Sequence, residues 1–247
     1  MTIFDHLFVF VFVVIYPIAG YIGFKRLLKS VAGGATINRG DMYRTTAIYH
    51  WTLFLVALLL WSNLQRPWSA LGMDLVVDGW FLAALGLTIA GIVTLFVQVR
   101  QMASAEQADV AKVRAQFGKL VLIIPQNGNE LARFNLLSIT AGIVEELLWR
   151  GFLIWYLGQF MPLWAAAIVS GVGFGVAHAY QGLEHLPKLS LVGCIFAGLY
   201  LLSGSIWLPM ILHAAADILQ GRLAHDVMNR SGGTDNGMND LGAEATP

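Results

Sequence analysis

The sequence predicts an all-α fold, a polytopic bundle of about seven transmembrane helices (six to eight). Hydrophobic residues make up 57% of the 247 residues, and the mean hydropathy is +0.67. Asp, Glu, Lys and Arg together make up 12%, about half the charged fraction of an ordinary soluble domain. A soluble fold of this size cannot bury so much apolar surface. The composition therefore excludes a soluble globular protein and a disordered chain.

Seven apolar runs account for these helices, since a helix needs about 20 mostly apolar residues to cross the hydrocarbon core. The sixth run is the shortest, so its ends are the least defined. Pro162, Pro187 and Pro209 stand at the expected first turns of the last three helices, where the missing N–H of proline costs nothing. The predicted spans are residues 7–24, 45–65, 79–99, 134–157, 162–180, 189–202 and 206–221.

Basic residues predict the orientation, because cytoplasmic loops carry an excess of Lys and Arg. Segments 25–46 and 100–133 each hold five of them, whereas 66–78 holds only Arg66. We therefore expect the N-terminus outside and, after seven spans, the C-terminus in the cytoplasm. No Lys or Arg precedes the first run, which favours a retained anchor over a signal peptide. The chain is predicted to be an integral, multi-pass membrane protein, in the inner membrane if its source is bacterial.

The chain is expected to divide into three regions. Residues 1–120 form N-terminal transmembrane helices with basic cytoplasmic loops, and residues 121–228 form a second helical core that holds the polar residues described next. Residues 229–247 form a tail rich in Gly, Asn and Asp that is expected to be disordered. Within the third loop, residues 102–120 are expected to extend the third helix or to lie along the membrane surface.

Charged residues inside membrane spans usually face a cavity and have a function. Four occur here, all in the C-terminal half and accompanied by two histidines. Glu146 and Arg150 are four residues apart, as are His213 and Asp217, so each pair shares a helix face. Glu145 lies about 100° around the helix from Glu146, so one acid can pair with Arg150 while the other faces a site. The full set is Glu145, Glu146, Arg150, His178, His213 and Asp217.

This set of side chains suits the hydrolysis of a peptide bond. A carboxylate can act as a general base toward water, and histidines can hold that water or stabilise an oxyanion. Imidazole and carboxylate are also zinc ligands, and the candidate ligands are Glu145, His178 and His213. A zinc-assisted mechanism and a metal-free glutamate mechanism both fit these residues.

Three motifs follow one another on consecutive hydrophobic runs. Residues 145–150 read EExxxR, residues 174–178 read FxxxH and residues 213–217 read HxxxD. In this order they resemble the CPBP family, which comprises type II CAAX prenyl endopeptidases and bacterial Abi intramembrane proteases. The resemblance covers residues 129–220, and the Gly-Phe pair that follows the first motif strengthens it.

The resemblance implies roles for the residues of the first two motifs. Glu145 would activate the hydrolytic water, and His178 would help to activate or coordinate it. Glu146 and Arg150 would form an ion pair that shapes the site. A metal is often assigned to this family, and a metal-free glutamate mechanism has also been argued for it.

The third motif departs from the usual family pattern at its last position. His213 and Asp217 would line an oxyanion site, but the family often has Asn where this chain has Asp217. An aspartate can donate a hydrogen bond only when it is protonated. Asp217 would therefore carry a proton or would act by orienting His213.

The predicted function is an intramembrane endopeptidase that acts on a membrane-associated or lipidated peptide or protein among membrane lipids. The formal net charge is zero, so we expect no nucleic-acid partner. The alternative is a transporter or a scaffold that uses the same buried polar groups. The sequence shows no internal repeat of the kind that transporters have, which disfavours the transporter.

One further histidine lies in a predicted span of the N-terminal half. His50 stands between Tyr49 and Trp51 in the second run. Aromatic residues are enriched at membrane interfaces. We therefore expect His50 to belong to an aromatic belt or to a contact between helices, with no part in the chemistry.

Overall fold

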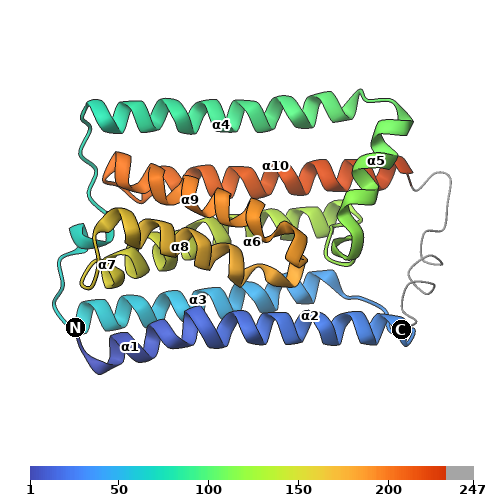
Figure 1. Ribbon diagram of the computed structural model, residues 1–247. Coiled ribbons are helices and arrows are strands. Elements are labelled where there is room, and N and C mark those ends of the chain that lie inside the picture. The colour runs from blue at the N-terminus through green and yellow to red at the C-terminus, as the bar shows by residue number, and fades with distance from the viewer. Residues whose placement is uncertain (232–247) are drawn as a thin grey trace.

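The polypeptide folds into helices and the turns that join them. The computed structural model describes residues 1–231, and this part of the chain holds no β-strand. The long helices run alongside one another, with α4 at one margin of the bundle and α2 and α3 at the other (Figure 1). The α-helices are α1 (Ile3–Phe10), α2 (Tyr16–Ala32), α3 (Arg39–Asn63), α4 (Gly79–Ala103), α5 (Gln107–Phe117), α6 (Gly128–Glu146), α7 (Ile154–Leu157), α8 (Leu163–Ala177), α9 (Leu186–Ser203) and α10 (Trp207–Ser231).

Five helical stretches are long and apolar enough to cross a membrane. They are Ile3–Ala32, Arg39–Asn63, Gly79–Ala103, Leu163–Gln181 and Leu183–Ser203. The first of them joins α1 and α2 through a π turn at Val11–Ile15. The prediction of an all-helical, multi-pass membrane protein is confirmed. Two more long helical stretches, residues 128–157 and α10, carry the charged residues that the sequence places inside spans.

Side-chain caps fix where three long helices begin. Asn38, Asp78 and Asn127 stand just before α3, α4 and α6, and each accepts a hydrogen bond from the backbone N–H three residues later, at 2.8–3.0 Å. α6 therefore begins at Gly128, ahead of the predicted start at Phe134. Its first turns are polar, so they lie outside the apolar run that predicts this helix.

The helix that carries the two glutamates is irregular. α6 ends at Glu146, a π turn follows over Leu147–Leu153, and α7 continues the helix to Leu157. Every residue of this turn is buried. The carbonyl of Trp149, within the turn, accepts a hydrogen bond from Ser170 Oγ on α8 at 2.6 Å. Single π turns inside α-helices are frequent at functional sites, and this one directly follows Glu146.

Small residues let the helices around the glutamates approach closely. A Cβ atom added at Gly142 of α6 would lie 2.8 Å from the backbone nitrogen of Ala214 on α10. A Cβ atom added at Gly171 of α8 would lie 2.6 Å from the backbone nitrogen of Cys194 on α9. Between membrane helices, where lipid tails weaken the hydrophobic effect, such close contacts are a main source of association.

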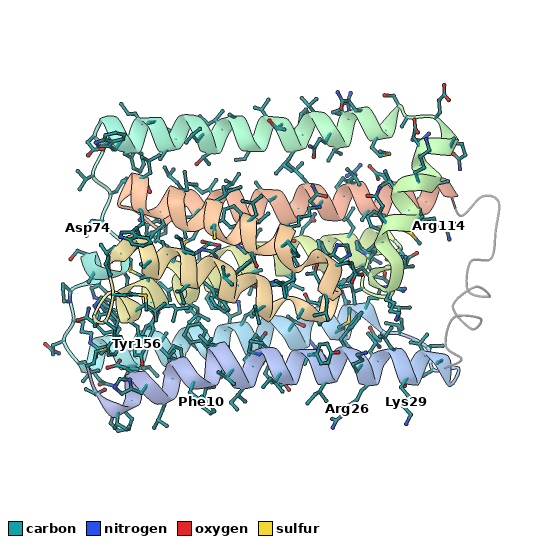
Figure 2. The ribbon with its side chains drawn as sticks, in the orientation of Figure 1. Phe10, Arg26, Lys29, Asp74, Arg114 and Tyr156 are labelled. Carbon is teal, nitrogen blue, oxygen red and sulfur yellow. The ribbon has the colours of Figure 1, made fainter. Side chains whose placement is uncertain are left out.

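The two ends of the bundle differ in charge. Figure 2 shows Arg26, Lys29 and Arg114 at one end, called here the basic end, and Asp74 and Tyr156 at the opposite end. The two loops that the sequence predicts on one side of the membrane therefore lie at the same end of the bundle.

Residues 102–120 form the end of α4 and a separate helix, α5, rather than one extension of the third helix. The guanidinium of Arg230, on α10, donates hydrogen bonds to the carbonyls of Met102 and Ala105 at 2.6 Å each. This contact holds the junction between α4 and α5 against α10. The predicted tail begins at residue 229, but α10 continues to Ser231, and residues 232–247 lie outside the described residues.

A buried ion pair joins the elements at the opposite end. Arg66 donates a hydrogen bond to each carboxylate oxygen of Asp5, at 2.7 Å in both cases. The guanidinium also lies 4.4 Å from the centre of the Trp155 ring. The first helix, the loop after α3 and α7 are thereby held together.

Candidate active site

Glu146 lies at the centre of a buried polar cluster. Its Oε1 accepts a hydrogen bond from Arg150 at 2.8 Å and lies 2.7 Å from Nδ1 of His213. The side chains of Glu146 and Arg150 have no exposed surface. The pairing predicted from the four-residue spacing is therefore confirmed. A buried charge is costly unless it is paired, so each member of this cluster depends on the others.

Aromatic rings and backbone enclose the guanidinium of Arg150. It lies 4.5 Å from the centre of the Phe174 ring and 5.3 Å from that of Phe196. It also donates a hydrogen bond to the carbonyl of Gly193 at 3.0 Å. Within residues 1–231, Arg150 Nε and Glu146 Oε2 find no hydrogen-bond partner. Arg150 thus links the glutamate helix to α8 and α9.

Glu145 faces a different set of residues. Its Oε2 lies 3.8 Å from Nε2 of His178, at the end of α8. Nδ1 of His178 lies 2.8 Å from the carbonyl of Phe174, and a carbonyl can only accept, so Nδ1 donates. In the neutral ring Nε2 is then an acceptor that faces a second acceptor. Two acceptors in this arrangement suit one water molecule that donates a hydrogen bond to each.

His213 directs its second nitrogen away from Glu146. Nδ1 faces the Glu146 carboxylate and therefore donates, while Nε2 lies 3.7 Å from Oδ2 of Asp217. The imidazole stacks on Phe196, with ring centres 5.2 Å apart, and this fixes its plane. The side chain of His213 is 6% exposed and that of Asp217 is 41% exposed. The region around the histidine therefore opens along α10, in the direction of the basic end.

The six residues predicted from the motifs lie in one region. α6 supplies both glutamates, the π turn supplies Arg150, α8 ends at His178, and α10 supplies His213 and Asp217. Two contact groups form, one around Glu145 and one around Glu146. Because the two acids are neighbours in the chain, the groups are directly connected. This arrangement can hold a water molecule on one side and a charged imidazole on the other.

Of the two expectations for His50, the structure supports a contact between helices and not an aromatic belt. The residue is 6% exposed, and its Nε2 lies 3.4 Å from Oε1 of Glu145. A lone histidine between two aromatic residues carries no motif, so the sequence offered no local signal for this contact. One weaker signal was the residue type, because an ionisable side chain within a membrane span is unusual.

The predicted zinc ligands do not form a metal site. Within residues 1–231, no group of three or more His, Cys, Asp or Glu side chains is placed so that it could hold a metal ion. Of the three expected ligands, His213 has its ion-pair contacts with Glu146 and Asp217, not with Glu145 or His178. Glu145 and His178 contribute one facing atom each. The residues present therefore do not fit the metal, and the chemistry below uses only side chains of the chain and water.

Comparison with known proteins agrees with the motif pattern. Residues 127–219 match the family model described as type II CAAX prenyl endopeptidase Rce1-like. The resemblance inferred from the three motifs is thereby confirmed over this segment. It contains all six residues predicted for the site, and it excludes α1 to α5.

Two curated proteins are similar to parts of the chain. The "Putative membrane peptidase YdiL" of Bacillus subtilis (strain 168) is 27% identical over 152 residues, which is 61% of this chain and 56% of that protein. The "Uncharacterized 24.3 kDa protein" of Escherichia coli is 34% identical over 84 residues, which is 33% of this chain and 39% of that protein. The matches thus span about half of the relatives' length or less. No solved structure matches the chain.

Proposed function

We propose that this protein is an intramembrane endopeptidase that hydrolyses a peptide bond with a water molecule activated by Glu145. The observation that carries the proposal is the facing pair of acceptors, Glu145 Oε2 and His178 Nε2, 3.8 Å apart. The similarity of residues 127–219 to type II CAAX prenyl endopeptidases supports it. So does the name of the Bacillus subtilis relative, which describes a membrane peptidase.

The first step of the proposed reaction uses Glu145 as the general base. A water molecule donates one hydrogen bond to Glu145 Oε2 and the other to His178 Nε2. As its oxygen forms a bond to the scissile carbonyl carbon, Glu145 takes one proton. The same carboxyl group then gives this proton to the leaving nitrogen as the C–N bond breaks. The products are a carboxyl group and an amine, and Glu145 is ionised again.

In this proposal His213 stabilises the oxyanion that forms during the addition. Its Nδ1 donates to Glu146, so Nε2 can donate only when the ring carries both protons. Carboxylates on both sides of the ring, Glu146 and Asp217, stabilise this imidazolium by their charge. In this proposal Asp217 orients and charges His213 and need not itself be protonated. Donors aimed at a developing oxyanion are among the largest contributions to catalysis.

The substrate class follows from the depth of the site. His50 of α3 and Glu145 of α6 lie about 16 Å and 26 Å from the first residues of their helices, at 1.5 Å per residue. Both helices begin at the basic end, so the reacting groups lie well inside the span. A substrate must therefore place its peptide bond at a site inside the membrane, which favours a membrane-associated or lipidated peptide. The rise in exposure from His213 to Asp217 supports an approach from the basic end.

We propose seven crossings, with residues 128–157 and α10 added to the five apolar spans. These two helices run beside α3 and α4. Glu146 and Arg150 are fully buried, and the partly exposed Asp217 lies beside His213. The basic end would face the cytoplasm, with the N-terminus outside. Residues 121–228 would form the catalytic core and residues 1–120 its N-terminal support.

The test of this function uses purified protein in liposomes and a library of membrane-anchored peptides, with mass spectrometry to find cleaved bonds. Wild type is expected to cut at least one peptide. Glu145→Gln should lower the rate by about 10²–10⁴-fold, the usual contribution of a general base. His178→Ala and His213→Ala should also lose cleavage while remaining folded. Glu184→Gln, at an acid whose side chain is 73% exposed, is the matched control and should cleave as wild type does.

Undiminished cleavage by Glu145→Gln would overturn the proposed mechanism. Absence of cleavage by wild type across the library, together with substrate-dependent ion flux, would favour the transporter. Metal analysis of the active protein and treatment with a chelator form a further arm of the test. Stoichiometric zinc with chelator-sensitive cleavage would contradict the metal-free water activation.

A further inference from the structure

His50 lies outside the segment that matches the endopeptidase family, yet it contacts the candidate active site. The residue is on α3, and the family match begins at residue 127. Its Nε2 lies 3.4 Å from Glu145 Oε1, and the side chain is 7% exposed. The Tyr16 ring of α2 packs near it, with ring centres 5.9 Å apart. The N-terminal helices thus enclose one side of the reacting carboxylate.

The two oxygens of Glu145 have separate surroundings. Oε1 faces His50, whereas Oε2 faces His178 at 3.8 Å. Oε2 has no hydrogen-bond partner in the part of the chain that the structure describes. The neutral ring of His178 cannot hold the carboxylate, because its proton is on Nδ1 and is donated to the carbonyl of Phe174. His50 therefore faces the oxygen that the proposed water does not use.

The surroundings of His50 also decide where its proton lies. Nδ1 of this ring is buried and has no hydrogen-bond partner among the described residues. A neutral imidazole carries one N–H and one unprotonated nitrogen. The proton is better placed on Nε2, where the Glu145 carboxylate can accept a hydrogen bond from it. On Nδ1 it would find no acceptor among the described residues. The 3.4 Å separation is long for a hydrogen bond, and catalytic hydrogen bonds often shorten when substrate binds.

We infer that His50 is a positioning residue for the general base, an inference that rests on the proposed peptidase function. Nε2–H of His50 holds Oε1 of Glu145, so that Oε2 points at the water and His178. Without this donor the carboxylate can rotate about its last side-chain bond, and neither oxygen is fixed toward the water. The N-terminal helices then contribute directly to the geometry of a site whose reacting groups all come from the C-terminal half.

The test compares His50→Phe, which keeps an aromatic ring but removes the donor, with His50→Gln, which restores an N–H at the same distance along the side chain. We expect His50→Phe to lower kcat by about 10²-fold, the cost of misplacing a catalytic group by about 1 Å. KM should stay within about twofold of wild type, because His50 touches the base and not the substrate. His50→Gln should recover most of kcat. Tyr49→Phe, at an exposed neighbour on α3, is the control for general effects of this helix.

A second readout does not depend on cleavage. The carboxylate stretching band of Glu145 is obtained by infrared difference spectroscopy, as each protein minus the same protein with Glu145→Gln. Loss of the hydrogen bond to Oε1 should shift this band in His50→Phe and leave it near the wild-type position in His50→Gln. An unshifted band in His50→Phe, or wild-type kcat in that variant, would overturn the inference. If wild type cleaves nothing, the proposed function fails, and the band still decides whether His50 holds Glu145.

Discussion

Glu145 and Glu146 are neighbours in the chain, but they contact opposite surroundings. Oε1 of Glu146 is held at 2.7–2.8 Å by Arg150 and His213, whereas the contacts of Glu145 to His50 and His178 are longer, at 3.4 Å and 3.8 Å. A buried carboxylate in a close ion pair stabilises the fold, and one without a close partner is available for chemistry. Substitutions at the two positions should therefore have different consequences.

Replacing Glu146 with Gln should destabilise the protein. The change leaves the Arg150 guanidinium charged and buried without its counterion. Breaking a buried pair in this way costs about 3–5 kcal/mol. Thermal unfolding followed by tryptophan fluorescence in detergent should show a lower midpoint than wild type and Glu184→Gln. A wild-type midpoint for Glu146→Gln would contradict the structural role assigned to this acid.

At the scale of single residues, the sequence predicted the side-chain contacts that follow from spacing along one helix. Glu146 and Arg150 pair as their separation of four residues requires. The bond from His213 to Glu146 was not predicted, because it joins α6 and α10 across the bundle. His50 was missed for the same reason, since its partner is Glu145 on a different helix. Contacts between distant segments depend on the packing of the helices, which no single motif contains.

Among the elements, the irregular helix of residues 128–157 and its neighbour α8 form the frame of the site. The apolar run in the sequence predicts this helix but not its π turn, since hydrophobic periodicity assumes a regular helix. The polar sequence around Asn127 was an available signal for its start, because Asn is a favoured N-cap residue. Two substitutions test how this frame holds the glutamates.

Ser170→Ala should weaken the attachment of α8 to the π turn. The hydroxyl donates to the carbonyl of Trp149, and its removal takes this buried hydrogen bond away. Such a loss costs about 1–3 kcal/mol. The same thermal measurement should show this effect, whereas Ser62→Ala, at an exposed position of α3, should change the midpoint little. Equal midpoints for the two variants would show that the hydrogen bond contributes nothing.

Gly142→Ala should push α10 away from α6. The new Cβ would lie 2.8 Å from the backbone of Ala214, next to His213, and 2.9 Å from the carbonyl of Met210. Overpacking of this kind costs about 1–3 kcal/mol, and the bond from His213 to Glu146 should lengthen. We expect lower stability and lower kcat together. Gly86→Ala, where the Cβ meets no atom within 4 Å, is the matched control and should match or exceed wild-type stability.

For the molecule as a whole, composition was sufficient to predict a helical membrane bundle, because so little charge cannot solvate a soluble surface of this size. The close packing of α6 with α10, and of α8 with α9, depends on particular glycines and could not be read from composition. The clustering of basic residues at one end supports the orientation proposed from the loops (Figure 2).

Cysteine labelling tests this orientation. In a Cys194→Ser background, Ser30→Cys places a thiol at the basic end and Ser69→Cys places one at the opposite end, both at exposed positions. A membrane-impermeant maleimide added to intact cells should label Ser69→Cys, and it should label Ser30→Cys only after the membrane is permeabilised. The reverse pattern would invert the proposed topology.

The π turn at Leu147–Leu153 lies where an inserted or deleted residue would change the register of the glutamate helix. Each residue of an α-helix turns the chain by about 100°, so one residue added or removed here rotates everything after it against everything before it. The two glutamates precede the turn, and Trp155 follows it, with its ring 4.7 Å from that of Trp61. An insertion in this turn would therefore change the phase between the acids and the aromatic contacts of the opposite end. Both groups would remain in place along the helix, but they could no longer face their partners together.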